Sequence, residues 1–449
     1  MADSANGLRR ELGLAAVTAI VVGDIIGSGI FYTPGEIAAL ASSTWQVYSI
    51  WILCGLIVLC GTLTVAELST ILPRAGATYH MIREAWGPFW GFLKIWMEMW
   101  VSGPGSVAGI AVLFGTFLSQ LLGAKSILTP AAYGAIAIAG FTAVNLLGVR
   151  WGGRTQVALT STKILALLVL VGGGLLAAAP PHAPATAAGN GGILQFLRFL
   201  GLAIASVLYT YDGWIDVTHV AGEVRQPERD LTRGLIFGVT AVIAIYLLVN
   251  ASFLRVVPLG EMASNPGAIA GAVAERAFGT NGSTFLNGLL MVSILGSMGG
   301  LMMTLPRLFY AGSCDFRDQA GAGHPLRHFY GPLSLVSRKT AVPAGSIIFC
   351  AAISIFALLF FQTFNRIVTF FVVAAQTVNI LAVSSIFRLP RSSSYRVPGY
   401  PAVPAVFVGT MILLLISVVV YQPYDSIWGI VLTCTGVPVY FWLNKRGRR

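Results

Sequence analysis

The first long apolar segment of this chain is interrupted at residues 23–31, which read GDIIGSGIF. Three glycines and a serine disfavour a continuous helix there, because each glycine costs about 1 kcal/mol in a helix interior. In a bilayer, a broken helix is tolerated only where its freed backbone groups line a cavity or are buried in protein. Such breaks indicate the binding site of a membrane carrier. The segment therefore predicts a site for a small charged or zwitterionic solute.

Composition supports a chain that crosses a membrane many times. Apolar residues fill 56% and charged residues 10% of the 449 positions, whereas soluble domains contain about 25% charged residues. This length accommodates about twelve spans of ~20 residues. The net charge of +11 then reflects orientation, because cytoplasmic loops collect Lys and Arg. We expect a multi-pass protein of the inner (plasma) membrane with both termini in the cytoplasm.

The apolar runs predict an all-α polytopic fold. Expected spans lie near 14–34, 46–68, 88–120, 129–149, 155–178, 193–219, 234–256, 284–312, 341–361, 366–388, 402–421 and 427–443. The sixth expected span also carries a break, SVLYTYDGW at residues 206–214. Because the first and sixth spans would run in opposite directions, the pattern predicts an inverted repeat of five plus five helices. The predicted division is 1–13 (cytoplasmic N-terminus), 14–178 (first repeat), 179–192 (extracellular loop), 193–388 (second repeat), 389–443 (two further helices) and 444–449 (basic cytoplasmic tail).

The first break predicts an anion site. If the helix stops around Ile26 and restarts, the amides of Gly27, Ser28 and Gly29 lie at a helix N-terminus, whose partial positive charge suits a carboxylate. The alternative is a face of small residues for close helix packing. Because the glycines crowd into one place instead of recurring at every fourth position, we favour the binding site.

The second break predicts a site for an ammonium group. Unwinding would expose carbonyl oxygens near Ser206, Tyr209 and Thr210, and the Tyr209 ring has two interpretations, an aromatic gate or simple packing. Asp212 is an acid within an apolar span, which costs ~2.5–3.5 kcal/mol and is functional by default. Two interpretations stay open for Asp212: contact with the ligand, or capping of the second half-helix.

Other charged residues in or beside the spans have weaker assignments. Lys163 either lies buried, where it can cycle a proton or replace a bound cation, or snorkels to the interface. Asp24 either faces a vestibule, caps the broken helix or transfers protons. Glu223 and its charged neighbours most simply form a solvated face, with a gate-locking salt bridge as the weaker alternative. The cysteines and histidines show no metal or catalytic spacing, so no cofactor, metal site or enzymatic activity is expected.

At these positions the chain resembles the amino acid–polyamine–organocation (APC) superfamily, and within it the L-type amino-acid transporter (LAT) group. The resemblance rests on the order and spacing of several motifs. These are GSGIF (27–31), PRAGATY (73–79), EAWGP (84–88), GW (213–214), GE (222–223) and PER (227–229).

The resemblance implies a fold of about twelve helices with a five-plus-five inverted repeat and alternating access. It implies that the substrate carboxylate meets Gly27–Gly29, and that the amino group meets carbonyls around Ser206, Tyr209 and Thr210. Tyr209 falls where relatives often carry a gating aromatic residue. Lys163 falls where several sodium-independent members keep a lysine in place of a sodium site.

Two departures from the family pattern matter. Asp212 stands where many animal L-type members have glycine, which leaves the charge preference for substrate open. The loop near 123–130 has no cysteine, so no disulfide-linked heavy chain is expected.

The sequence thus predicts a sodium-independent amino-acid transporter, an exchanger of neutral L-amino acids working by alternating access. The alternative is a proton-coupled amino-acid permease, or a permease for polyamines or cationic amino acids. The expected partners are the amino-acid substrate and the lipid bilayer, and no nucleic acid.

Overall fold

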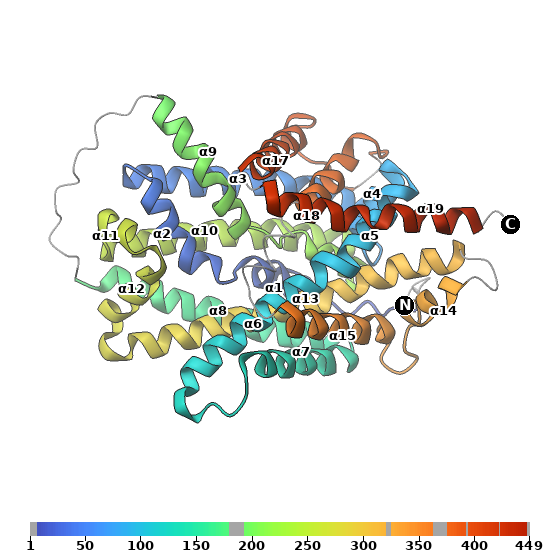
Figure 1. The fold of residues 1–449 in the computed structure, drawn as a ribbon. Coiled ribbons are helices and arrows are strands. Elements are labelled where there is room, and N and C mark those ends of the chain that lie inside the picture. The colour runs from blue at the N-terminus through green and yellow to red at the C-terminus, as the bar shows by residue number, and fades with distance from the viewer. Residues whose placement is uncertain are drawn as a thin grey trace.

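A computed structural model describes residues 7–178, 193–319, 325–361, 375–391, 394–421 and 423–446, and within these the chain forms one bundle of helices (Figure 1). Its first half contains α1 (Leu14–Ile25), α2 (Gly29–Leu40), α3 (Thr44–Ile71), α4 (Ala77–Trp86), α5 (Pro88–Met97), η1 (Glu98–Ser102), α6 (Gly103–Leu122), η2 (Gly123–Lys125), α7 (Pro130–Leu146), α8 (Val149–Leu176) and α9 (Ile193–Thr210).

The second half begins with two irregular turns that follow α9. Its elements are η3 (Asp216–Glu223), η4 (Pro227–Leu231), α10 (Thr232–Val256), α11 (Leu259–Ser264), η5 (Pro266–Ala268), α12 (Ile269–Phe278), η6 (Gly279–Asn281), α13 (Gly282–Gln319), α14 (Pro325–Leu333), α15 (Ala344–Phe361), η7 (Ser385–Phe387), α17 (Ala402–Tyr421), α18 (Pro423–Cys434) and α19 (Gly436–Arg446). A further apolar helix runs over Ala375–Phe387, which includes η7.

Large apolar side chains cover the outside of the bundle as well as its core. Leu165 is 65% exposed, Leu413 69% and Phe360 71%, and an exterior of this kind needs lipid around it. Among the described residues, six helices are long and apolar enough to cross a bilayer, or seven if the bent pair α1 and α2 forms one span. The chain is therefore a multi-pass membrane protein, as its composition predicts.

Helix α1 lies inside the bundle, packed against α8, α10 and α13. Its close approach to α10 depends on two glycines four residues apart. A Cβ atom on Gly234 would lie 2.4 Å from Val17 Cγ1, and one on Gly238 would lie 2.6 Å from Val21 Cγ1. Small residues at this spacing let two membrane helices meet backbone to backbone. The first predicted break therefore lies where neighbouring helices surround it.

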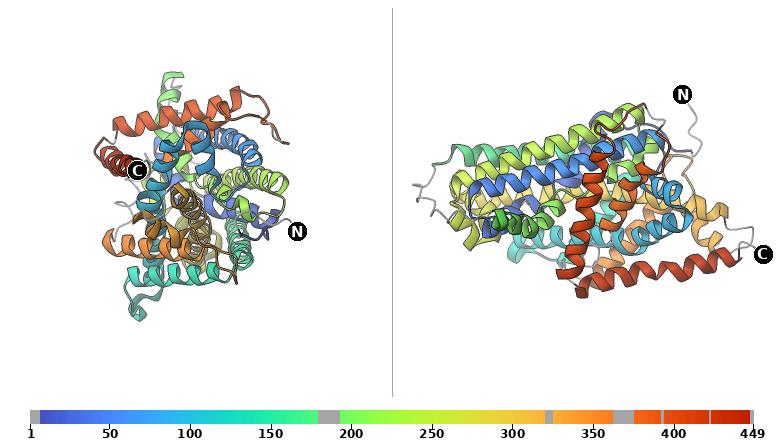
Figure 2. Two further views of the ribbon diagram at one scale, coloured as in Figure 1. Left: turned by 90° about the vertical axis from the view of Figure 1, so that its right-hand side faces the viewer. Right: turned by 90° about the horizontal axis from the view of Figure 1, so that it is seen from above.

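Both chain ends lie at the same end of the bundle, which we call the terminal end (Figures 1 and 2). The short helices α4 and α14 lie at this end too. An even number of crossings is needed to bring the two termini to one side. The arrangement agrees with the prediction that both termini lie on one side of the membrane.

Candidate functional site

The first break lies where the sequence predicts it. Helix α1 ends at Ile25, α2 begins at Gly29, and the two axes differ by 44°. Ile26 is fully buried, whereas residues 27–29 are partly exposed. Ser28 is the N-cap residue of α2 and makes no capping bond through its side chain, so its hydroxyl is available to another partner. The amide of Gly27 differs from expectation, because it already donates to Ile25 O at 2.9 Å.

The second break begins one turn later than the sequence indicates. Helix α9 continues through Thr210, and Gly213 then adopts φ +97° before η3. Ser206 lies inside α9, where its carbonyl oxygen accepts from Thr210 Oγ1 at 2.8 Å. Tyr209 O accepts from the amide of Asp212 at 3.1 Å. The prediction of a free carbonyl is therefore wrong for Ser206, since the helix does not unwind there.

The two breaks contact each other directly. A Cβ atom on Gly29 would lie 3.1 Å from the Thr210 side chain, and one on Gly213 would lie 2.9 Å from Asp24 O. Thr33 Oγ1 and Thr210 Oγ1 are 2.8 Å apart, within hydrogen-bond distance. The glycines thus have a second role besides ending helices. They let two interrupted backbones approach closely enough to form one site.

Tyr246 of α10 joins the two breaks. Its hydroxyl lies 2.9 Å from Thr210 O and 3.1 Å from Ile25 O, and the residue is fully buried. The sequence analysis missed it. A tyrosine inside an apolar span signals a hydrogen bond, because its hydroxyl needs a partner when buried, but nothing in the sequence says that the partners are two helix ends.

Lys163 is buried at the first break and does not snorkel. It is 0% exposed, and its Nζ donates to Gly23 O at 2.9 Å and to Ile26 O at 2.5 Å. Gly296 of α13 makes room for it, since a Cβ there would lie 2.9 Å from Nζ. The prediction of a buried lysine is confirmed, and the interfacial alternative is wrong.

Two serines of α13 complete the shell around these carbonyls. Ser297 Oγ donates to Gly23 O at 3.0 Å, and Ser293 Oγ lies 3.1 Å from Ile26 O and 3.2 Å from Gly27 O. One ammonium group and two hydroxyl groups therefore hold the end of α1. Such a ring of donors satisfies carbonyls that a broken helix leaves without partners.

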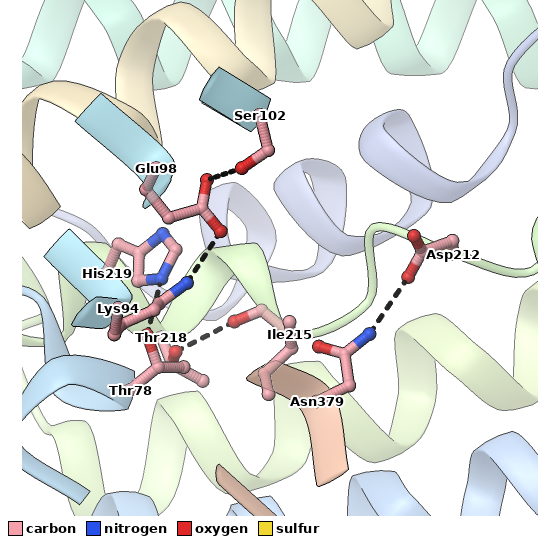
Figure 3. Close-up of polar contacts among 9 residues, drawn as sticks. All are labelled: Thr78, Lys94, Glu98, Ser102, Asp212, Ile215, Thr218, His219 and Asn379. Atoms are coloured by element: carbon pink, nitrogen blue, oxygen red, sulfur yellow. Dashed lines mark hydrogen bonds and ion pairs between the residues drawn. The ribbon is translucent and has the colours of Figure 1, made fainter. Parts of the chain in front are cut away.

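Asp212 projects from the second break toward the apolar helix Ala375–Phe387, where its Oδ1 lies 3.5 Å from Asn379 Nδ2 (Figure 3). Tyr209, three residues earlier, has 44% of its surface exposed although it lies on α9 next to the break. An accessible aromatic ring beside an intramembrane acid agrees with a role in covering a ligand.

A buried ion pair lies near the second break and was missed by the sequence analysis. Lys94 Nζ and Glu98 Oε1 are 2.7 Å apart, and Ser102 Oγ donates to Glu98 Oε2 at 2.9 Å (Figure 3). In the same view, His219 Nε2 lies 2.8 Å from Thr78 Oγ1. The signal was available, because Lys and Glu at i,i+4 inside an apolar run can pair on one helix face.

A second buried ion pair joins η3 to α13. Glu223 and Arg307 are both 0% exposed and form an ion pair of 2.8 Å. The backbone of Leu12 is bound to the same segment, because its amide donates to Glu223 O at 3.0 Å and its carbonyl accepts from Arg225 N at 2.8 Å. The interpretation of Glu223 as part of a solvated face is therefore wrong, because the side chain is buried and paired.

The described residues contain no group of three His, Cys, Asp or Glu side chains able to hold a metal ion. The polar groups at the breaks are backbone amides and carbonyls, hydroxyls, one lysine and scattered acids. This set suits the recognition of a small polar solute.

The chain is similar to known proteins over nearly its whole length. The model of an amino acid permease family matches residues 12–439. The serine/threonine exchanger SteT of Bacillus subtilis is 28% identical over 98% of this chain and 98% of its own length. The human cystine/glutamate transporter is 26% identical (97% and 85% covered), and the mouse b(0,+)-type amino acid transporter 1 is 27% identical (97% and 88% covered).

Proposed function

Because this chain belongs to the amino acid permease family, we propose that it is a sodium-independent exchanger of neutral L-amino acids that works by alternating access. It is a transporter and not an enzyme. The proposal goes beyond the family in three respects: the substrate class, the exchange of one amino acid for another, and independence from sodium. The relatives named above are one serine/threonine exchanger and two further amino-acid transporters, which supports the first two.

The observation that carries the proposal is the position of Lys163. Its ammonium group lies between the carbonyl oxygens of Gly23 and Ile26, at the end of a broken helix. Oxygen atoms of this kind are the ligands that an alkali cation uses in carriers built from broken helices. A side-chain ammonium group between these carbonyl oxygens takes the place of a bound cation, so the site does not require sodium to hold its carbonyls together.

The two breaks supply complementary groups for an amino acid. In this proposal the substrate carboxylate meets the N-terminus of α2 at Ile26, Gly27, Ser28 and Gly29, where partial positive charge accumulates. The substrate ammonium group meets the carbonyl end of α9 at Tyr209 and Thr210. Ser206 contributes through Thr210, whose hydroxyl it holds, and Asp212 lies beside the same end.

The architecture of the proposal follows from the helices. Five shorter apolar helices join the six long spans and the bent pair among the described residues, which supports twelve crossings. We assign 14–178 and 193–388 to the two inverted repeats and 389–443 to two further helices. We assign the protein to the plasma membrane, with the terminal end on the cytoplasmic side. Residues 1–13 and 444–449 are then cytoplasmic, and residues 179–192 are extracellular. The carrier works without a disulfide-linked heavy chain.

Proteoliposomes test the function. Purified protein is reconstituted into vesicles that are empty or loaded with L-serine, and uptake of labelled L-serine is measured in sodium and in choline buffers. We expect uptake to need internal amino acid and to be equal in the two buffers. Lys163→Gln should lower exchange at least about tenfold, because charge-assisted hydrogen bonds contribute about 1.5–3 kcal/mol. Strict sodium dependence together with full activity of Lys163→Ala would refute the proposal.

A second candidate function rests on the acids near the second break. Asp212, Asp216 and Glu98 give this region more carboxylates than the single ammonium of Lys94 balances, which favours a cationic substrate such as a polyamine or a basic amino acid. Competition of L-serine uptake by putrescine, lost in Asp212→Asn, would support this function. Absence of competition would exclude it in favour of neutral substrates.

A further inference from the structure

Asp24 lies in the last turn of α1, directly after the carbonyl group that Lys163 binds. Its carboxylate occupies the space beside Gly300 of α13, which is free because this residue has no side chain. A Cβ atom on Gly300 would lie 1.5 Å from Asp24 Oδ1 and 2.9 Å from Oδ2. On the other side, the backbone of Asp24 contacts Gly213 of the second break. The acid is thus enclosed between α13 and the contact of the two breaks.

The carboxylate has no partner there. Both oxygens of Asp24 are buried, and neither has a hydrogen-bond partner within the described part of the chain. The ion pairs found among those residues do not include Asp24 either. An ionised carboxylate without partners in a dry interior is unfavourable by several kcal/mol, far more than its neutral form.

Charged and titratable groups surround Asp24 on the elements packed against α1, yet each has another partner or the wrong sign. Lys163 of α8 attracts a negative charge on Asp24, but it makes its hydrogen bonds to Gly23 O and Ile26 O. Tyr246 of α10 lies against Ile25 O and Thr210 O. Arg307 of α13 pairs with Glu223 of η3. Asp216, also of η3, repels a negative charge on Asp24.

The more distant groups of those elements belong to other contacts. His219 of η3 is bound to Thr78. Glu228, Arg229 and Asp230 lie in η4, which follows Arg225, and the amide of Arg225 donates to Leu12 O ahead of the start of α1. Glu98 and Lys94 pair with each other. None of these groups supplies the missing donor.

We propose that Asp24 is a proton-binding site of the transport cycle, which holds a proton while α1 is packed on α13 and releases it when α1 moves away from Gly300. The enclosure disfavours the ionised form of the carboxylate, and binding of a proton converts that form into the neutral acid. Movement of α1 admits water, and water makes ionisation favourable again. This inference rests on the proposed alternating-access function, because it needs a cycle in which α1 moves.

Binding of the proton can be measured without transport. Infrared difference spectra of the purified wild-type protein and Asp24→Asn, recorded at about pH 7, should show the carbonyl stretch of a protonated carboxylic acid that only the wild type contains. Asp318→Asn is the matched control, since Asp318 is 64% exposed and pairs with Arg317. This control should remove an ionised-carboxylate band. Loss of an ionised band in Asp24→Asn would overturn the proposal.

Transport gives the second readout. The rate of L-serine exchange is measured at about pH 6 and about pH 8, with the same pH on both sides, and the ratio of the two rates is compared among variants. In the wild type and Asp318→Asn the rate should fall toward tenfold per pH unit above the titration midpoint. In Asp24→Asn, which cannot ionise, the ratio should be close to one. An unchanged ratio in Asp24→Asn would overturn the proposal.

The two readouts separate this inference from the proposed function. A wild-type protein that shows the protonated band but exchanges no amino acid would refute the exchanger and leave Asp24 as a proton site. A wild-type protein that exchanges L-serine with the same pH ratio as Asp24→Asn would keep the exchanger and refute the inference.

Discussion

The hydroxyl group of Tyr246 holds both breaks of the candidate site, so its removal should weaken substrate binding more than its size suggests. Tyr246→Phe keeps the ring and its contacts with Trp51 and Tyr211, whose centroids lie 5.3 and 4.9 Å away. It deletes only the group that contacts Thr210 O and Ile25 O. The change therefore tests the link between the breaks and not the packing of the core.

The size of the effect follows from the bonds lost. A hydroxyl donates one proton, so Tyr246 makes one full hydrogen bond shared between two carbonyl oxygens in a buried position. Leaving a buried acceptor without its donor costs about 1–3 kcal/mol. If this energy favours the arrangement of breaks that binds substrate, the apparent dissociation constant rises in inverse proportion to the fraction of protein that keeps that arrangement. The expected limit is about 5–150-fold.

A scintillation proximity assay with labelled L-serine measures this on purified protein. The matched control is Tyr211→Phe, because Tyr211 is equally buried and its hydroxyl makes a longer bond of 3.3 Å to Trp51 O. We expect at least a fivefold rise in Kd for Tyr246→Phe and less than about threefold for Tyr211→Phe. Equal effects of the two variants, or no effect of Tyr246→Phe in folded protein, would refute the reasoning.

Three further predictions concern the backbone at Gly213, the ion pair of Glu223 and Arg307, and the stability of the protein at low pH. Gly213→Ala should lower the unfolding temperature, because it adds strain of about 1–3 kcal/mol at φ +97° and a close contact with Asp24 O. The control Gly201→Ala in α9, where an added Cβ meets nothing within 4 Å, should raise the unfolding temperature, and the reverse order would contradict this. Glu223→Gln leaves Arg307 buried without its charge partner, at a cost of about 3–5 kcal/mol. If this pair keeps the terminal end closed, the variant should show increased labelling of a cysteine introduced there, and unchanged labelling would refute that role. Burial lowers the pKa of His80 in α4 to about 4, below its unfolded value of about 6.5, so the protein should lose stability as the pH falls from the higher to the lower value. Thermal unfolding of His80→Gln should show a weaker loss of stability than the wild type over this range, and an identical pH profile of the two proteins would contradict the assignment.

Much of the fold could be read from the sequence because hydrophobic runs and glycine clusters act locally. The 56% apolar composition predicts a membrane protein, and the glycines at 23–31 predict a helix break that the structure has between Ile25 and Gly29. Lys163 could be singled out because an ammonium group in an apolar run is costly unless it is bound, and only the family resemblance favoured a functional role for it. These signals need no knowledge of neighbours. The end of α9 was placed too early, since Asp212 and Gly213 end the helix only after Thr210.

Contacts between distant segments could not be read from the sequence. Tyr246 bridges two helix ends 36 and 221 residues away, and Glu223 pairs with Arg307 from another helix. The carboxylate of Asp24 is isolated because Gly300 gives it space and none of the described residues donates to it. The sequence by itself determined that the chain enters the membrane and where its first helix breaks. The tertiary structure alone decided which groups satisfy the freed backbone and which charges stay unpaired, because hydrogen bonds and desolvation depend on neighbours that only packing brings together.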